Sequence, residues 1–203
     1  NSQPIKIDDV PTDVVAAVLA VEDANFFGHR GVNLRALVRA MLSNFESGNA
    51  RQGASTITQQ VVKNEYLGGI ERDGRYKILQ ARYAALLEKK VSKKQILERY
   101  LNTVYLGNNA YGLQAAAEIY FGTDVGKLTI EQATFLAGMI QAPSSYDPIR
   151  HPERARQRFG IALKRVAAEG LVTADRAASL ASTWQLPEVL QSVPERAISR
   201  TYF

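Results

Sequence analysis

The chain has 203 residues, of which 46% are hydrophobic and 22% are charged, so it can bury a substantial core as one domain or as two closely packed lobes. It contains no cysteine, which excludes a disulfide framework and a thiolate nucleophile. The formal net charge of +5 suits phosphate-bearing or anionic membrane partners, although a surplus of this size is also common on soluble protein surfaces.

The first predicted element is a buried helix that ends in a carboxylate pair. Thr12 is a suitable N-cap, and residues 14–20 are all apolar. The last turn carries Glu22, which Asp23 follows. The negative end of the helix dipole and partial burial both disfavour an ionised carboxylate, so we expect a raised pKa for Glu22 and a role as a general base. An ordinary solvated Glu-Asp pair is the alternative.

The next two predicted helices are basic or capped by hydroxyl groups. Asn33 precedes an amphipathic, basic helix over residues 34–45, which either faces the core or lies on a lipid surface. Ser55 and Thr56 are placed to cap a further helix that carries Lys63 two turns later. Free backbone N–H groups at such a helix start, together with a lysine, can hold a phosphate. A plain capped surface helix is the alternative.

The helix expected after residues 73–74 has two candidate faces. We predict a core face of Leu79, Tyr83, Leu86 and Leu87, and a second face of Lys77, Gln80 and Ala84.

Five further helices are predicted from capping and stop signals. A capping box at Ser92 begins a helix that runs through Tyr105 and stops at Gly107. The others cover about residues 113–120, 129–140, 152–168 and 173–182. No alternating strand run of convincing length is present, so the predicted fold class is all-α or nearly so.

Two groups of basic residues are expected to be solvated faces: Lys89, Lys90, Lys93 and Lys94, and Arg154, Arg156 and Arg158. Neither group is interleaved with aromatic residues, so no nucleic-acid partner is expected.

The sequence lacks the motifs of several catalytic classes. With two histidines and no clustered carboxylates, a built-in zinc site is not expected. The sequence also has no serine nucleophile elbow and no Walker loop. One promising carboxylate with cations downstream fits transfer at a phosphate-linked carbon, in which a base deprotonates a hydroxyl and cations hold the departing phosphate. Sugar polymerisation from a pyrophosphate-linked donor has this chemistry.

Several segments, in order, resemble the motifs of the peptidoglycan glycosyltransferases, which are the monofunctional transglycosylases and the glycosyltransferase modules of class A penicillin-binding proteins. The segments are EDANFFGHRG at 22–31, RQGASTITQQVVKN at 51–64 and ILERYLN with VYLG at 96–107, then 110–112, 120–122 and 142–148. We therefore predict a glycosyltransferase domain over residues 1–190, including a membrane-proximal region at about 32–75. Residues 191–203 form a C-terminal extension compatible with the start of a linker to a further domain.

The resemblance implies a mainly helical fold with a lysozyme-like larger lobe and a smaller membrane-proximal lobe. It implies polymerisation of lipid II, in which the acceptor GlcNAc 4-hydroxyl attacks the donor anomeric carbon with inversion and loss of undecaprenyl pyrophosphate. A divalent cation, Mg²⁺ or Mn²⁺, is expected with the substrate pyrophosphate, with no protein ligands assigned and no organic cofactor.

The resemblance also implies partners and a location. The partners are lipid II, the growing glycan strand, the membrane surface, and a transpeptidase domain or other cell-wall synthesis proteins. The location is the outer face of the bacterial cytoplasmic membrane, with an N-terminal anchor helix that is absent from this chain. Because no apolar run approaches the ~20 residues of a spanning helix and the chain ends without a stop signal, we expect it to be part of a longer protein.

The family's functional residues carry over position by position. Glu22 matches the general base, and Arg158 matches an arginine of the late basic helix. The substrate-binding candidates are Asp23, Phe26, His29, Gln52, Ser55, Thr56, Gln59, Gln60, Lys63, Asn64, Lys77, Tyr100 and Tyr105.

The chain departs from the family at Gln80, a candidate catalytic position where the family usually has a second glutamate. An amide cannot exchange a proton at ordinary pH and should weaken the hold on a cation. The alternative function is therefore a catalytically weakened domain that binds lipid II or glycan. A lysozyme-like hydrolase is a third hypothesis, which requires a second carboxylate across the cleft.

Overall fold

The computed structural model describes residues 4–34, 55–70 and 74–187, and these ranges are mainly helical with no β-strand. The α-helices are α1 (Thr12–Glu22), α3 (Ile57–Glu65), α4 (Gly74–Lys90), α5 (Lys93–Thr103), α6 (Leu113–Phe121), α7 (Ile130–Met139), α8 (Pro152–Ala168) and α9 (Ala174–Thr183). The predicted fold class is therefore confirmed.

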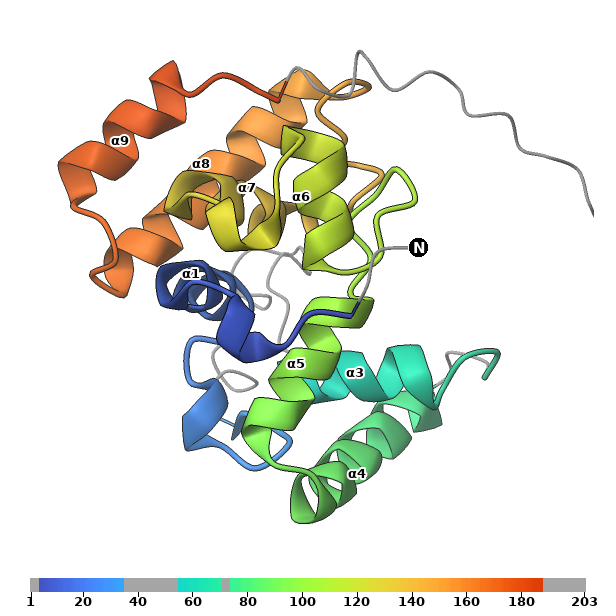
Figure 1. Cartoon of the computed structure of the whole chain (residues 1–203). Helices are drawn as coiled ribbons and strands as arrows, with labels where there is room; N and C mark the ends of the chain where they lie inside the picture. Colours follow the sequence, from blue (N-terminus) through green and yellow to red (C-terminus); the bar gives the residue numbers. More distant parts are fainter. Residues whose placement is uncertain (1–3, 35–54, 71–73, 188–203) are drawn as a thin grey trace, which may run out of the picture.

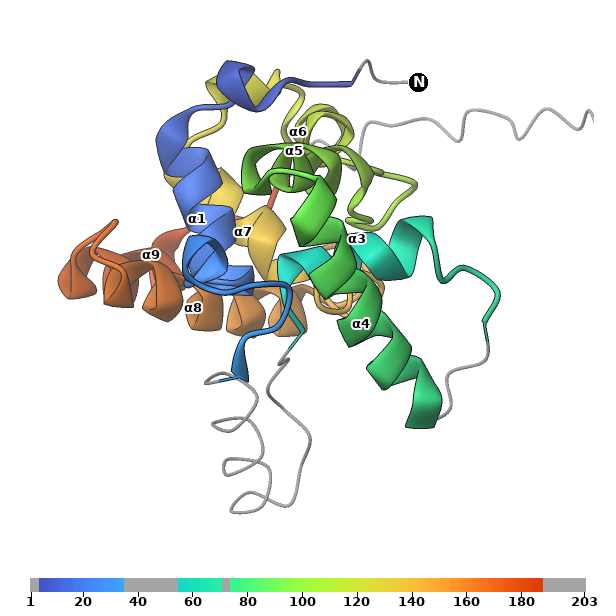
Figure 2. The ribbon, with the colours of Figure 1, turned by 90° about the horizontal axis from the view of Figure 1, so that it is seen from below.

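The helices form two groups that α5 joins. In Figure 1, α1 and α6 to α9 lie in the upper part of the molecule and α3 and α4 in the lower part, with α5 between them. Figure 2 shows the same division from below, with α1, α7, α8 and α9 on one side of α5 and α3 and α4 on the other. Residues near the C-terminal end of α1 therefore face residues of α3 and α4 across the junction of the two groups.

The main core surrounds α1 and α7. Both helices are apolar on nearly all sides, and α7 is buried at every position from Ala133 to Met139. The main core also takes in Ile57 and Val61 of α3 and the apolar residues of α5, so it continues from one group of helices into the other. The expected burial of α1 is confirmed, because its residues Val14, Ala17, Val18, Ala20 and Val21 are buried.

Capping side chains begin three of the predicted helices as expected. Thr56, Ser92 and Thr129 each form a complete capping box with the glutamine three residues later. The prediction for Thr12 is wrong. Pro11 is the N-cap of α1 and Thr12 is its first residue, without a side-chain capping hydrogen bond.

Helix α5 ends earlier than predicted, at Thr103. The chain beyond it turns back on itself, with an isolated bridge between Tyr105 and Tyr111. The N–H of Gly112 donates to the carbonyl of Val104 at 2.8 Å. These backbone bonds within the loop compete with helix extension, so Gly107, with φ of +87°, is a turn residue within this loop and not a helix stop.

The core face of α4 differs from the predicted one. Tyr83 and Leu86 are 45% and 41% exposed, whereas Gln80 and Ala84 are buried together with Tyr76. The prediction is wrong for Tyr83 and Leu86 and right for Leu87, which packs against the core. The burial of Gln80 was not expected because its side chain is polar. The Gln80 side chain can be buried because both ends of its amide are hydrogen-bonded.

Two other expectations concern the membrane. The basic helix expected over residues 34–45 lies outside the described residues from residue 35 on, as does about half of the membrane-proximal region expected at about 32–75. Within the described ranges, no helix combines the length and the hydrophobicity that crossing a bilayer requires.

Candidate active site

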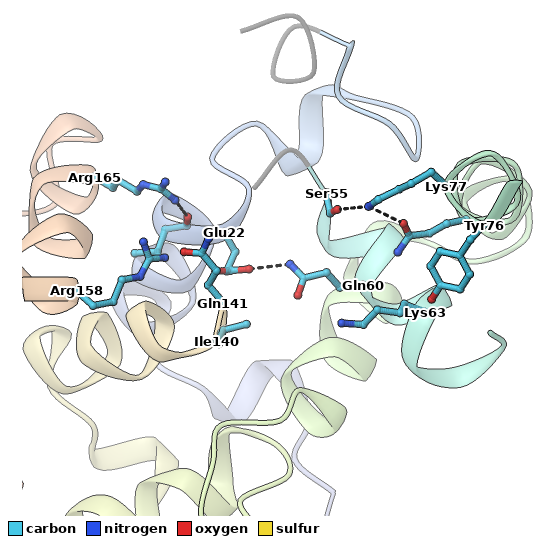
Figure 3. Close-up of a pocket in the computed structure, with 12 residues that line it drawn as sticks. Glu22, Ser55, Gln60, Lys63, Tyr76, Lys77, Ile140, Gln141, Arg158 and Arg165 are labelled. Carbon is cyan, nitrogen blue, oxygen red and sulfur yellow. Dashed lines mark hydrogen bonds between the residues drawn. The ribbon is translucent and has the colours of Figure 1, made fainter. Parts of the chain in front are cut away.

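A pocket of about 370 Å³ lies at the junction of the two helix groups (Figure 3). Its walls are formed by Val21 and Glu22 of α1, Ser55 just before α3, Gln60 and Lys63 of α3, Tyr76, Lys77 and Gln80 of α4, Ile140 and Gln141 after α7, and Arg158 and Arg165 of α8. Because the walls come from five segments that are distant in sequence, tertiary packing creates the pocket.

Glu22 is the last residue of α1 and points into this pocket. Gln60 Nε2 donates a hydrogen bond to Glu22 Oε2 at 2.7 Å, and the Tyr100 hydroxyl donates to the same oxygen at 3.4 Å. Burial raises the pKa of Glu22, while the hydrogen bond from Gln60 and the charges of Arg158 and Arg165 act in the opposite direction. The predicted direction of the shift is confirmed, and a carboxylate in this environment is suited to accept a proton.

Lys77 lies on the opposite wall, held by two hydrogen bonds. Its Nζ donates to Ser55 Oγ at 2.9 Å and to Gln80 Oε1 at 3.0 Å (Figure 3). Burial lowers the pKa of Lys77. Lys63 reaches the same side of the pocket from α3. The two lysines therefore face Glu22 from across the pocket and make this wall suitable for an anion.

Gln80 is 2% exposed, and both the oxygen and the nitrogen of its side-chain amide are hydrogen-bonded. Its Oε1 accepts from Lys77, and its Nε2 donates to the Gln59 carbonyl oxygen at 2.8 Å. The amide nitrogen is the group that meets this carbonyl, and a carboxylate oxygen there would face another acceptor. The immediate environment of Gln80 is therefore complementary to an amide.

Arg158 and Arg165 line the pocket on the α8 side of Glu22 (Figure 3). Arg158 is 7% exposed, and its Nε donates to the Gly138 carbonyl oxygen at 2.7 Å. Arg165 donates to the Val21 carbonyl oxygen. The prediction of a solvated face is therefore wrong for Arg158, because burial against α7 brings it to the pocket. Arg165 was not among the predicted site residues, although its spacing of seven residues from Arg158 places both on one helix face.

Four substrate-binding candidates form a buried frame behind the pocket and do not line it. They are Asp23, Phe26, Thr56 and Gln59. Asp23 Oδ2 accepts hydrogen bonds from the backbone N–H of Ile57 at 3.1 Å and from His29 Nε2 at 2.9 Å. Thr56 Oγ1 donates to the carbonyl oxygen of Gly31 at 2.6 Å. This frame joins the end of α1 to the start of α3, and so brings Gln60 to Glu22.

The same hydrogen bonds correct the phosphate prediction for the start of α3. The backbone N–H groups of Thr56, Ile57 and Gln59 already donate to side-chain oxygens of the protein. These three groups are not free to bind a phosphate, so Lys63 and Lys77 are the anion-binding candidates on this wall.

The remaining candidates lie in different places. Tyr100 is fully buried beneath Glu22, whereas Tyr105 stacks beside Tyr111 with 4.9 Å between ring centroids and does not line the pocket. Asn64 is exposed on α3, and Gln52 lies outside the described residues.

Lys93 also departs from the expected solvated face. Its Nζ lies 2.7 Å from Glu88 Oε1 and 4.2 Å from the centre of the Phe26 ring. The lysine therefore packs against the frame behind the pocket by an ion pair and a cation–π contact.

Comparison with known proteins shows related chains. The family model described as transglycosylase matches residues 1–167. Penicillin-binding protein 1A of Aquifex aeolicus is 45% identical over 172 residues, which cover 85% of this chain and 24% of the relative. Penicillin-binding protein 1A of Escherichia coli is 38% identical over 196 residues, which cover 94% of this chain and 23% of the relative. The chain thus spans about a quarter of the length of these relatives.

A solved structure supports the fold. The crystal structure of penicillin-binding protein 1A from Haemophilus influenzae aligns with a TM-score of 0.54 at 21% identity, over 92% of this chain and 18% of that chain. Together with the match of the family model over residues 1–167, these relatives show that the chain belongs to the transglycosylase family, the peptidoglycan glycosyltransferases of class A penicillin-binding proteins.

Proposed function

We propose that this domain polymerises lipid II into glycan strands. The GlcNAc 4-hydroxyl of the acceptor attacks the anomeric carbon of the donor, which is the growing strand on undecaprenyl pyrophosphate. The new bond joins the 4-oxygen to the anomeric carbon, and the bond from that carbon to the pyrophosphate breaks with inversion. Glu22 accepts the hydroxyl proton, and the pyrophosphate leaves with the bonding electron pair.

One observation carries this proposal: Glu22 is the single carboxylate among the described residues of the pocket, and four cationic side chains line the same walls. A lone base opposite lysines suits attack by a hydroxyl and departure of a dianionic group. A lysozyme-like hydrolase is disfavoured, since the described pocket walls hold no second carboxylate. The test is incubation of the purified domain with lipid II, where we expect long glycan chains; release of soluble sugars from peptidoglycan without polymer would contradict the proposal.

The described residues do not fit a divalent-cation site built by the protein. Among them, no group of three His, Cys, Asp or Glu side chains comes together, and the Gln80 oxygen already accepts from Lys77. We therefore derive no step through a metal ion. In our proposal, a Mg²⁺ or Mn²⁺ ion that arrives with lipid II is held by the pyrophosphate oxygens, while Lys63 and Lys77 contact the same group.

A substitution at Gln80 distinguishes a fully active domain from the alternative, a catalytically weakened domain that binds lipid II or glycan. Because the amide is matched to the Gln59 carbonyl and to Lys77, we expect Gln80→Glu to change the polymerisation rate by less than about threefold and to lower stability by about 1–3 kcal/mol. The measurement is polymer yield at several Mg²⁺ concentrations, with denaturant unfolding in parallel. Activation by more than about tenfold (~1.4 kcal/mol) would instead favour the weakened domain.

The outward face of α4 supports a membrane surface as partner. Ile78 and Leu86 are 71% and 41% exposed, and they share this face with the exposed Arg82 and Lys89. Exposed apolar side chains bury area at a lipid interface, and nearby cations are attracted to anionic headgroups. We propose that this face contacts lipid at the outer face of the cytoplasmic membrane, and that a transpeptidase domain or other cell-wall synthesis proteins act beside the domain.

The lipid contact can be tested with vesicles of phosphatidylglycerol and phosphatidylethanolamine. The double variant Ile78→Ser, Leu86→Ser should bind them about tenfold more weakly, because two exposed apolar side chains are lost at the interface. Ile161→Ser is the matched control, since Ile161 is 46% exposed on α8. Equal binding by all three proteins in a sedimentation assay would exclude this face of α4 as the lipid contact.

A further inference from the structure

Arg165 connects α8 to the end of α1 beside the proposed base. Its guanidinium donates a hydrogen bond to the backbone carbonyl oxygen of Val21, the residue before Glu22. Val21 is 1% exposed, so this carbonyl has little access to water. Figure 3 shows Arg165 reaching from α8 to the backbone of α1, on the side of Glu22 away from Gln60.

The accepting carbonyl lies in the last turn of α1. Carbonyls in the last turn of a helix have no partner four residues ahead within the helix, and they form the negative end of its dipole. Burying a carbonyl without a hydrogen bond destabilises the folded state, and the hydrogen bond from the guanidinium removes this cost at Val21. It also places a positive charge at the helix end that carries Glu22.

Arg158 has a different anchor, although it lies on the same face of α8. It donates to the Gly138 carbonyl of α7, and it therefore fixes α8 to α7 and not to α1. Of the two arginines that line the pocket, Arg165 is the one that donates a hydrogen bond to the backbone of α1.

We infer that Arg165 is a positioning residue, which holds the C-terminal end of α1, and with it the Glu22 carboxylate, in place against α8. The inference rests on the proposed function, in which Glu22 is the base. In this role, Arg165 makes no contact with the substrate.

Several charged or titratable groups surround Glu22 and influence its pKa. Arg158 and Arg165 face it from α8, Tyr100 from α5, Lys63 from α3 and Lys77 from α4, with Asp23 next to it in the chain. Both arginines favour the ionised form and so oppose the effect of burial on the pKa of Glu22. Removal of Arg165 should therefore raise this pKa, and polymerisation should begin to fall at a higher pH as the medium is acidified.

The experiment compares Arg165→Met and Arg165→Lys with the control Arg154→Met, which removes a charge from an exposed position of the same helix. For Arg165→Met we expect about tenfold lower kcat, an acid limb of the pH–rate profile displaced to higher pH, and little change in KM. For Arg165→Lys, which keeps the charge and loses the planar fork, we expect the wild-type acid limb with about threefold lower kcat. Arg154→Met should match the wild type, and thermal melts establish folding.

The outcomes are distinguishable. A wild-type profile for Arg165→Met, or an acid limb that moves equally in Arg154→Met, overturns the positioning role. If the Met variant does not fold, a wild-type kcat in Arg165→Lys overturns it as well, because that variant loses the planar guanidinium that bonds to the Val21 carbonyl. Glu22→Gln is measured alongside: if that variant still forms polymer, the proposed function itself is wrong, whereas an inactive Glu22→Gln with an unaltered Arg165→Met rejects only the inference about Arg165.

Discussion

Glu22→Gln is expected to abolish the formation of glycan chains from lipid II, with a rate at least about 10³-fold below that of the wild type. Glutamine has nearly the same shape as glutamate but cannot accept the proton of the attacking hydroxyl. Nothing else among the described pocket residues offers a carboxylate to replace it. The measurement is chain length and yield on gels after incubation with labelled lipid II.

Loss of activity in this variant should not reflect loss of folding. Burial raises the pKa of Glu22, so the folded state binds its proton more tightly than the unfolded state does. The contribution of Glu22 to stability therefore falls as pH rises through its pKa values, and a neutral glutamine removes that cost. We expect a melting temperature at neutral pH equal to or above that of the wild type. Glu153→Gln, at an exposed position of α8, is the matched control. Wild-type polymer yield from Glu22→Gln would remove Glu22 from the mechanism.

Lys77→Met is expected to lower kcat by about 10²-fold. The Lys77 ammonium is held toward the pocket by Ser55 and Gln80, and a fixed positive charge stabilises the pyrophosphate as it leaves. Because that charge develops most fully in the transition state, kcat should fall more than KM rises. Lys90→Met, which removes an exposed lysine of the same helix, should retain wild-type kinetics.

The pH dependence gives a second measure of the role of Lys77. Partial desolvation lowers the pKa of Lys77, so it loses its proton at a lower pH than a lysine ordinarily does. Activity should therefore decline on the alkaline side as Lys77 becomes neutral. In Lys77→Arg the charge persists, and the decline should move to higher pH. A kcat within twofold of the wild type in Lys77→Met, with an unaltered alkaline limb in Lys77→Arg, would show that Lys77 does not act on the leaving group.

The features that the sequence predicted well depend on local interactions. The capping boxes at Thr56, Ser92 and Thr129 join residues three apart, so the side chains that begin each helix are adjacent in the chain. The burial of α1 follows from its lack of a polar face, and the same continuous apolar run explains why Glu22 at its end has a raised pKa. Here local sequence and fold give the same answer.

The features that the sequence predicted poorly depend on partners far away in the chain. Apolar spacing placed Tyr83 and Leu86 in the core, but Gln80 is buried instead because the Gln59 carbonyl and Lys77 satisfy its amide. Charge clustering placed Arg158 in solvent, but a carbonyl of α7 makes its burial favourable. The free-energy cost of burying a polar group depends on its hydrogen-bond partners, and composition and periodicity do not identify those partners.

The sequence by itself determined most of the helices, the capped starts at Thr56, Ser92 and Thr129, the buried α1 with Glu22 at its end, and, through ordered motifs, the transglycosylase family. Only the tertiary structure decided which side chains share the pocket with Glu22. It placed Asp23, Phe26 and Thr56 behind the pocket as a frame and brought Arg165 to the end of α1. Local propensities act over a few residues, whereas this pocket is closed by side chains as far apart as Glu22 and Arg165, whose proximity exists only once α1, α3, α4 and α8 have packed.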